Sequence, residues 1–221
     1  MGNLSEQELK ELASQLSCPK GEGGIAVAES MNAANGNMIS KAMSRIGLHD
    51  NHEILEIGPG SGSHVWQLFQ KNATVKYTGI DISELMVEQA SKLCSGYAFC
   101  ESAVFELADG KTIDKPDSFF DAVFTVNTLY FWNSPQHYLL EIARVLKSAG
   151  QFVLAFIPKH VMVNLPFTRY GFKLYDNESI LNLLEGAGFK INEVISETEE
   201  VLSSTGDKKV RSFTIVRARK L

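Results

Sequence analysis

Residues 54–62 read Ile54-Leu-Glu-Ile-Gly-Pro-Gly-Ser-Gly62 and lead into a segment of helical character. Glycine at positions 58, 60 and 62 lets the backbone turn sharply and approach a ligand, because no Cβ stands in the way. The helix expected from Ser63 directs free N–H groups and a positive dipole end toward the same point. The pattern predicts a buried strand, a ligand-binding loop and a helix, located where the strand order of a parallel sheet reverses.

The chain beyond residue 52 alternates between short apolar runs and helical segments, which implies right-handed crossovers and a mostly parallel sheet covered on both faces. The expected strands are Glu53–Ile57, Val75–Ile80, Ala103–Leu107, Ala122–Val126, Phe152–Ile157, Ile191–Ile195 and Phe213–Val216. The expected helices between them are Ser63–Gln70, Ser83–Leu93, Pro135–Leu146 and Asn177–Ala187. The polar segment Glu197–Lys209 is expected to be a loop that joins a terminal antiparallel pair.

The first 50 residues are expected to be helical and to lack strands. Leu9, Leu12 and Leu16 share one helical stripe that Cys18-Pro-Lys-Gly21 interrupts. Two further helices, Ile25–Met31 and Met38–Ile46, are expected on either side of a break. Residues 1–50 are therefore predicted to be a helical extension, either a lid over the ligand site or plain packing, and residues 51–221 the core.

The composition is that of an ordinary globular protein: 44% hydrophobic and 21% charged residues in a chain of 221 fit one α/β domain with a helical extension. The net charge of −5 argues against electrostatic binding of a phosphate backbone, so no nucleic acid partner is expected. The basic cluster Arg217, Arg219 and Lys220 is interpreted as a solvated strand. No run of roughly 18 apolar residues occurs, so no membrane span is expected. Three cysteines suit reduced thiols in the cytoplasm.

The loop favours an amino-acid-like cofactor over a dinucleotide. Its spacing is G-x-G-x-G, whereas the dinucleotide fingerprint is G-x-G-x-x-G. Glu56 stands two residues before Gly58, where a carboxylate would repel a pyrophosphate but attract an ammonium or a sulfonium. Pro59 restricts the loop further. The alternative is a glycine-rich turn that binds nothing.

Two acidic residues follow the next expected strands. Asp81 comes 23 residues after Gly58, where a carboxylate can accept both hydrogen bonds of a ribose diol; the alternative is a helix N-cap before Ser83. Asp109, followed by Gly110, can accept from the exocyclic amine of adenine; the alternative is an ordinary Asp-Gly turn.

A polar residue also ends the strand that begins near Asp121. Asn127 is expected beside Gly58 across the crevice, near the reacting group. Tyr130 and Trp132 follow and could wall a pocket, where aromatic faces stabilise a sulfonium. The alternative is that these rings merely pack beneath the next helix.

These stretches, in this order, resemble the class I S-adenosylmethionine-dependent methyltransferases, and within them the group that includes the ubiquinone/menaquinone-biosynthesis C-methyltransferases and many small-molecule enzymes. The resemblance covers roughly residues 50–195 and is specific for fold and cofactor rather than for substrate. The matching segments are Ile54–Gly62, Gly79-Ile-Asp-Ile-Ser83, Asp109, Ser118-Phe-Phe-Asp-Ala-Val-Phe124, Glu141-Ile-Ala-Arg-Val-Leu-Lys147 and Gly186-Ala-Gly-Phe189.

The resemblance implies a Rossmann-like, seven-stranded sheet of order 3-2-1-4-5-7-6 with its last strand antiparallel and helices on both faces. It implies that the loop faces the methionine part of the cofactor, Asp81 the ribose, and Ile82 and Asp109 the adenine. The implied cofactor-binding residues are Glu56, Gly58, Pro59, Gly60, Gly62, Asp81, Ile82, Asp109, Gly110 and Asn127. The segment Lys111–Lys115 lacks the family's usual Leu-Pro-Phe, so the adenine-side loop is expected to differ in shape.

The sequence identifies neither the methyl acceptor nor the catalytic residues. Tyr130 and His160 are candidate general bases, needed only if the acceptor must lose a proton. No metal site is expected, because the histidines and cysteines lack ligand spacing. The prediction is methyl transfer to an unidentified small molecule. The alternatives are a non-catalytic S-adenosylmethionine-binding protein and a nicotinamide-dependent oxidoreductase.

Overall fold

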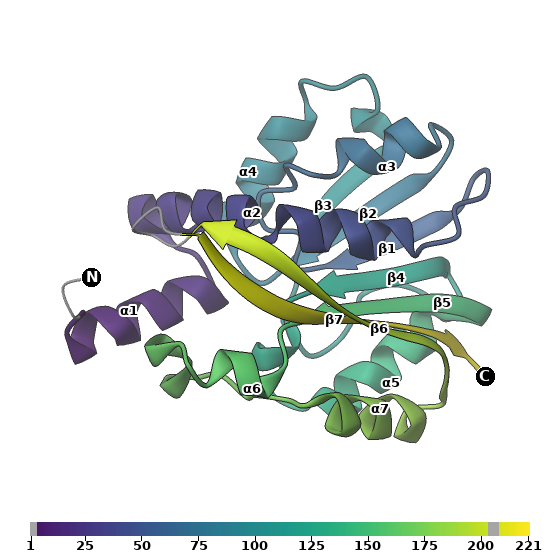
Figure 1. Ribbon diagram of the computed structural model, residues 1–221. Coiled ribbons are helices and arrows are strands. Elements are labelled where there is room, and N and C mark those ends of the chain that lie inside the picture. Colours follow the sequence, from purple (N-terminus) through teal and green to yellow (C-terminus); the bar gives the residue numbers. More distant parts are fainter. Residues whose placement is uncertain (1–3, 203–207) are drawn as a thin grey trace.

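The computed structural model describes residues 4–202 and 208–221. Within these residues one seven-stranded sheet has the order β3-β2-β1-β4-β5-β7-β6, which confirms the predicted α/β fold and its order. β1 to β5 pair in parallel, whereas β7 is antiparallel to β5 and to β6 (Figure 1). The strands are β1 (Glu53–Ile57), β2 (Lys76–Asp81), β3 (Ala103–Leu107), β4 (Phe120–Val126), β5 (Leu146–Phe156), β6 (Phe189–Leu202) and β7 (Lys208–Lys220).

Helices cover both faces of the sheet (Figure 1). α2 (Gly21–Ser44) crosses one face and contacts β4 and β5, while α5 (Pro135–Val145) and α7 (Asn177–Gly186) pack together on the other. The other helical segments are α1 (Glu6–Ser17), α3 (Trp66–Lys71), α4 (Glu84–Cys94), α6 (Lys159–Met162) and the short 3-10 turns η1 (Cys100–Ser102), η2 (Leu129–Phe131) and η3 (Pro166–Arg169). In the part of the chain that the structure describes, no helix is long and apolar enough to cross a membrane.

The core lies between the sheet and the two helical layers. In β4 the residues Ala122 to Thr125 are buried on both faces, as expected for a central parallel strand. The rings of Phe124, Phe152, Phe156 and Phe213 are completely shielded from solvent. This packed sheet holds the carboxyl ends of β1, β2 and β4 in fixed positions, and the loops of the candidate site begin there.

The last two strands are longer than predicted. The segment Glu197–Leu202 belongs to β6 and Lys208–Lys209 to β7, so the prediction of a loop over Glu197–Lys209 is wrong at both ends; residues 203–207 lie outside the described part. The strands are held by cross-strand pairs such as Glu199 opposite Arg211, whose Oε1 and Nε lie 2.7 Å apart. A strand with one face in solvent can be largely polar, which is why its sequence looks like a loop.

The predicted break in the N-terminal helices is also wrong, because α2 runs without interruption through Met31–Met38. Asparagine is a poor helix former in isolation, since its side chain competes for backbone hydrogen bonds. Here the side chains have partners elsewhere in the fold. Asn32 Nδ2 donates to Ser61 Oγ at 2.6 Å, and Asn37 Nδ2 donates to Glu199 Oε2 at 2.6 Å.

The same face of α2 is tied to β6 by charged side chains. Lys41 and Arg45 follow Asn37 at intervals of four residues, so all three point the same way from the helix. Lys41 pairs with Glu197, and Arg45 pairs with Glu193 at 3.3 Å. Together with the apolar packing of α2 on the sheet, these pairs hold the whole helix in place over the core.

Candidate functional site

A cleft opens at the carboxyl ends of β1 to β4, where the strand order reverses between β1 and β4. It encloses about 830 Å³ of space, counting the part open to solvent. Its walls come from the strand ends, from α1 and α2, and from η2 and α5. The lining residues include Leu16, Ser17, Pro19, Ala28, Met31, Asn32, Gly58, Gly60, Asp81, Ile82, Met86, Ala108, Gly110, Asn127, Thr128, Phe131, Trp132 and Tyr138.

The glycine-rich loop forms the centre of the cleft. Gly58 has φ +72°, and a Cβ there would lie 2.4 Å from Thr128 Cγ2, so only glycine lets the loop approach the end of β4. Gly60 has φ +57°, and a Cβ there would meet no atom within 4 Å. The backbone at Gly60 therefore faces open space in which a ligand can lie close to the main chain.

Asp81 presents a buried carboxylate to the cleft. Its side chain accepts from the N–H groups of Gly60 at 3.1 Å and of Ser83 at 2.9 Å, and it is 8% exposed. Burial raises the pKa of this carboxyl, and no Lys, Arg or His among the described residues pairs with it. The cap of α4 is Ser83, whose Oγ accepts from Met86 N–H at 3.2 Å. Asp81 is thus held in place beside the loop with lone pairs left for a ligand.

The side of the cleft next to the end of β3 is formed by Ile82, Ala108 and Gly110. Ile82 is 42% exposed, an apolar side chain with room for a flat partner. Asp109 is exposed and does not line the cleft. Its Oδ1 accepts from the N–H groups of Lys111 at 2.7 Å and Thr112 at 2.8 Å, and these bonds lower the pKa of the carboxyl.

Glu56 lies behind the loop at 2% exposure and is not among the residues that line the cleft. Its carboxylate accepts from Tyr77 Oη at 2.5 Å and lies 2.9 and 3.0 Å from His64 Nε2. Burial and the nearby Glu56 raise the pKa of Tyr77 well above its ordinary value. The three side chains connect β1, β2 and the segment that follows the loop.

Pro59 and Gly62 complete the loop and likewise do not line the cleft. A Cβ on Gly62 would lie 3.0 Å from the ring of Phe105.

Asn127 lines the cleft in a left-handed backbone conformation, with φ +59°. Its Nδ2 donates to Asn35 Oδ1 at 3.2 Å, and its Oδ1 lies 2.9 Å from Tyr130 Oη. Asn35 Oδ1 also accepts from Arg211 at 3.1 Å, so α2 and β7 hold this amide. The residue that the sequence placed near the reacting group is fixed by side chains distant in the chain.

The two candidate bases lie away from the cleft lining. Tyr130 Oη accepts from Ile157 N–H at 2.6 Å, and burial raises the pKa of its hydroxyl, which is therefore protonated at neutral pH. His160 is exposed on α6, with Nε2 3.4 Å from Ser212 Oγ. Trp132, by contrast, lines the cleft.

Sequence reasoning missed most of what the N-terminal helices contribute. Leu16, Pro19, Met31 and Asn32 line the cleft, but nothing in their local pattern marks them as site residues. The usable signal is the asparagine-rich run of α2, because asparagines inside a helix need partners elsewhere in the fold. Among the described residues no group of three or more His, Cys, Asp or Glu side chains could hold a metal ion.

The fold and the cleft define a Rossmann-like protein that binds a nucleotide-like ligand, and comparison with known proteins narrows this class. The profile of a methyltransferase domain family matches residues 55–154. An uncharacterised methyltransferase, YdaC, of Bacillus subtilis is 28% identical over 131 residues, 58% of this chain and 69% of that protein. Demethylmenaquinone methyltransferase of Tropheryma whipplei is 32% identical over 113 residues, 51% of this chain but only 45% of that protein. Other relatives are named tRNA U34 carboxymethyltransferase.

Solved structures share the fold. A geranyl diphosphate methyltransferase, solved with GPP and sinefungin, superposes with a TM-score of 0.72 at 12% identity, covering 84% of this chain and 79% of that one. Residues 55–154 therefore match a methyltransferase domain of the class I S-adenosylmethionine-dependent type, and S-adenosylmethionine is the cofactor of that family.

Proposed function

We propose that this methyltransferase transfers the methyl group of S-adenosylmethionine to a small-molecule acceptor bound beside the cleft. The observation that carries the proposal is the buried Asp81 carboxylate, which faces the cleft next to Gly60 with no cationic partner among the described residues. Its hydrogen bonds from the N–H groups of Gly60 and Ser83 leave further acceptor positions on the carboxylate, and a ribose diol supplies two donors. The open space at Gly60 and the apolar Ile82 fit the rest of an adenosyl group.

The residues that would hold the cofactor follow from these positions. We assign Asp81 to the ribose, Ile82 and Gly110 to the adenine, and the loop with Asn127 to the methionine part. Asp109 remains the proposed partner of the adenine amine. Its oxygens also accept hydrogen bonds from Lys111 and Thr112 in the turn that follows it. Glu56 lies behind the loop and supports it through its contacts with His64 and Tyr77.

The chain's contribution to the reaction is mainly alignment. The bound cofactor supplies a methyl carbon on a sulfonium: the acceptor atom forms the new bond as the carbon–sulfur bond breaks and the electron pair stays on sulfur. The loop and Asn127 orient the methionine part of the cofactor, while Phe131 and Trp132 exclude water from the cleft. Tyr130 holds Asn127 in place through its hydroxyl. His160 remains a proposed base for an acceptor that must lose a proton.

Binding of the demethylated product tests the assignment of the cleft. S-Adenosylhomocysteine at about a hundredfold above its Kd stabilises the protein by about 2.7 kcal/mol, which raises Tm by roughly 5–10 °C. NADH is expected to leave Tm unchanged. A shift with NADH alone would favour the oxidoreductase. A shift with S-adenosylhomocysteine but no methylated product from any acceptor would favour the non-catalytic binding protein.

We propose a small molecule rather than tRNA as the acceptor, because the net charge of −5 provides no general attraction for a phosphate backbone. Methylation of bulk tRNA by the purified protein with labelled cofactor would contradict this choice.

We also propose that α1 and the turn after it form a lid. Leu16, Ser17 and Pro19 line the cleft, whereas α1 buries only Ala13 fully. Removing residues 1–19 is expected to weaken S-adenosylhomocysteine binding roughly tenfold, since about 1.4 kcal/mol of contact is lost. Isothermal titration measures the affinity, and circular dichroism checks that α2 and the sheet persist. Unchanged affinity would rule the lid out.

A further inference from the structure

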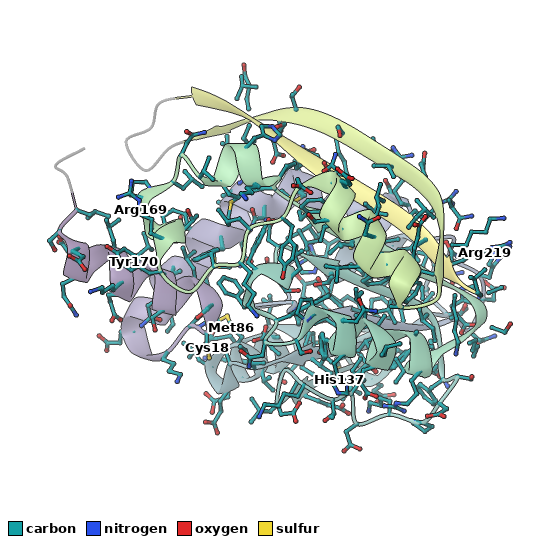
Figure 2. The ribbon with its side chains drawn as sticks, turned by 90° about the horizontal axis from the view of Figure 1, so that it is seen from below. Cys18, Met86, His137, Arg169, Tyr170 and Arg219 are labelled. Atoms are coloured by element: carbon teal, nitrogen blue, oxygen red, sulfur yellow. The ribbon has the colours of Figure 1, made fainter. Side chains whose placement is uncertain are left out.

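A second cavity lies beside the cleft, between α1 and the loop that follows η3. It holds about 440 Å³ of space, counting the part open to solvent. One wall is α1, with Lys10, Ala13, Ser14 and Ser17, and the other is formed by Phe131 and Tyr170. Figure 2 shows Tyr170 against α1, next to Arg169, and α1 and η3 are in contact.

The cavity and the cleft share two lining residues, Ser17 and Phe131. Phe131 ends η2, which begins two residues after Asn127 of the cleft. The cavity and the cleft are therefore neighbours, with Ser17 and Phe131 at their common boundary. The place where the two spaces meet is close to the end of β4, on the side of the cleft assigned above to the methionine part.

The walls of the cavity suit a flat ring. Phe131 is braced by Phe172, whose ring centroid lies 4.6 Å away in an edge-to-face arrangement, and Phe172 in turn contacts Phe167 at 5.7 Å. Tyr170 extends this aromatic wall. The facing wall of α1 carries only small side chains at Ala13 and Ser14, so a slot is left in which an aromatic ring can stack.

One positively charged side chain lines the cavity. Lys10 is the one Lys, Arg, Asp, Glu or His among the lining residues, and its Nζ lies 5.5 Å from the centroid of the Tyr170 ring. The ammonium also pairs with Glu6 Oε1 at 2.6 Å, on the exposed side of α1. Arg169, adjacent in sequence to Tyr170, is exposed and has no carboxylate partner in residues 4–202 and 208–221. Lys10 is the cation in the cavity wall that an acidic group on the ring would meet.

We propose that this cavity is the acceptor subsite and that it takes a planar aromatic molecule carrying an acidic group. The ring lies between α1 and the wall of Phe131 and Tyr170, the acidic group lies toward Lys10, and the methyl-accepting atom points past Phe131 into the cleft. This inference rests on the proposed function.

Fluorescent ring compounds test the subsite in the full chain saturated with S-adenosylhomocysteine. The probes are 2-naphthoate and its neutral analogue 2-naphthylmethanol. We expect naphthoate to bind at least threefold more tightly than the alcohol. Ser14→Phe fills the slot from an exposed helix position and is expected to weaken both probes tenfold or more. Ser91→Phe, the same change on the exposed surface of α4, is the matched control and leaves both affinities unchanged.

The charge is tested separately. Lys10→Met is expected to remove the preference for naphthoate without changing the affinity for the alcohol, whereas Lys92→Met on α4 preserves the preference. The proposal is overturned if S-adenosylhomocysteine binds but naphthoate does not, or if Ser14→Phe binds it as the unmodified chain does. If Lys10→Met changes the affinities for both probes equally, the proposed recognition of an acidic group by Lys10 is refuted. Failure of S-adenosylhomocysteine to bind would instead refute the proposed function.

Discussion

Asp81→Ala is expected to weaken binding of S-adenosylhomocysteine roughly 30- to 1,000-fold. Two hydrogen bonds from a ribose diol to a buried carboxylate contribute about 2–4 kcal/mol in total, because bonds to charged groups are the stronger kind. The carboxylate also accepts from the N–H groups of Gly60 and Ser83, so its loss loosens the loop as well. Isothermal titration calorimetry measures the change.

Two further variants separate these effects. Asp81→Asn keeps the shape and one acceptor oxygen, so its loss of affinity should fall between the unmodified chain and Asp81→Ala. Asp114→Ala removes an exposed carboxylate outside the cleft and is expected to bind normally. If Asp81→Ala binds within threefold of the unmodified chain, Asp81 does not hold the ribose.

The second large effect is on stability. Glu56→Ala leaves His64 and Tyr77 without their buried partner, and breaking a buried, hydrogen-bonded pair in this way costs about 3–5 kcal/mol. For a chain of this size that corresponds to a fall in Tm of roughly 6–20 °C. Thermal unfolding followed by circular dichroism measures it.

Glu53→Ala is the matched control for Glu56. It removes a carboxylate from the same strand, but the Glu53–Lys76 pair is open to solvent, with the lysine side chain 62% and the glutamate side chain 20% exposed. Surface pairs contribute at most about 1 kcal/mol, so Tm should barely change. A small effect of Glu56→Ala on Tm with a large loss of cofactor affinity would show that Glu56 contacts the methionine part directly, as the sequence resemblance implies.

The sheet and the loop could be predicted because their signals are local. The strand before Gly58 is an apolar run interrupted by Glu56, the glycines mark a turn, and Asp81 stands at the end of the next strand. Each feature depends on neighbours a few residues away, and the topology of parallel sheets adds the rest. The strand order followed from the family resemblance rather than from any one residue.

The features that sequence reasoning got wrong or left open depend on partners far along the chain. The asparagines of α2 look like a helix break until Ser61 and Glu199 accept their hydrogen bonds, 29 and 162 residues away. The segment after Glu197 looks like a loop until Arg211 pairs with it. Neither partner can be identified from local composition.

The sequence by itself determined the class of fold, the glycine loop and the acid at the end of β2, because short-range patterns specify strands, turns and helices. Only the tertiary structure decided which side chains face the cleft. It placed Glu56 behind the loop and brought Met31 and Phe131 to the cleft wall. Burial and hydrogen bonding depend on all the elements that pack around a residue, and those elements meet only in the folded chain.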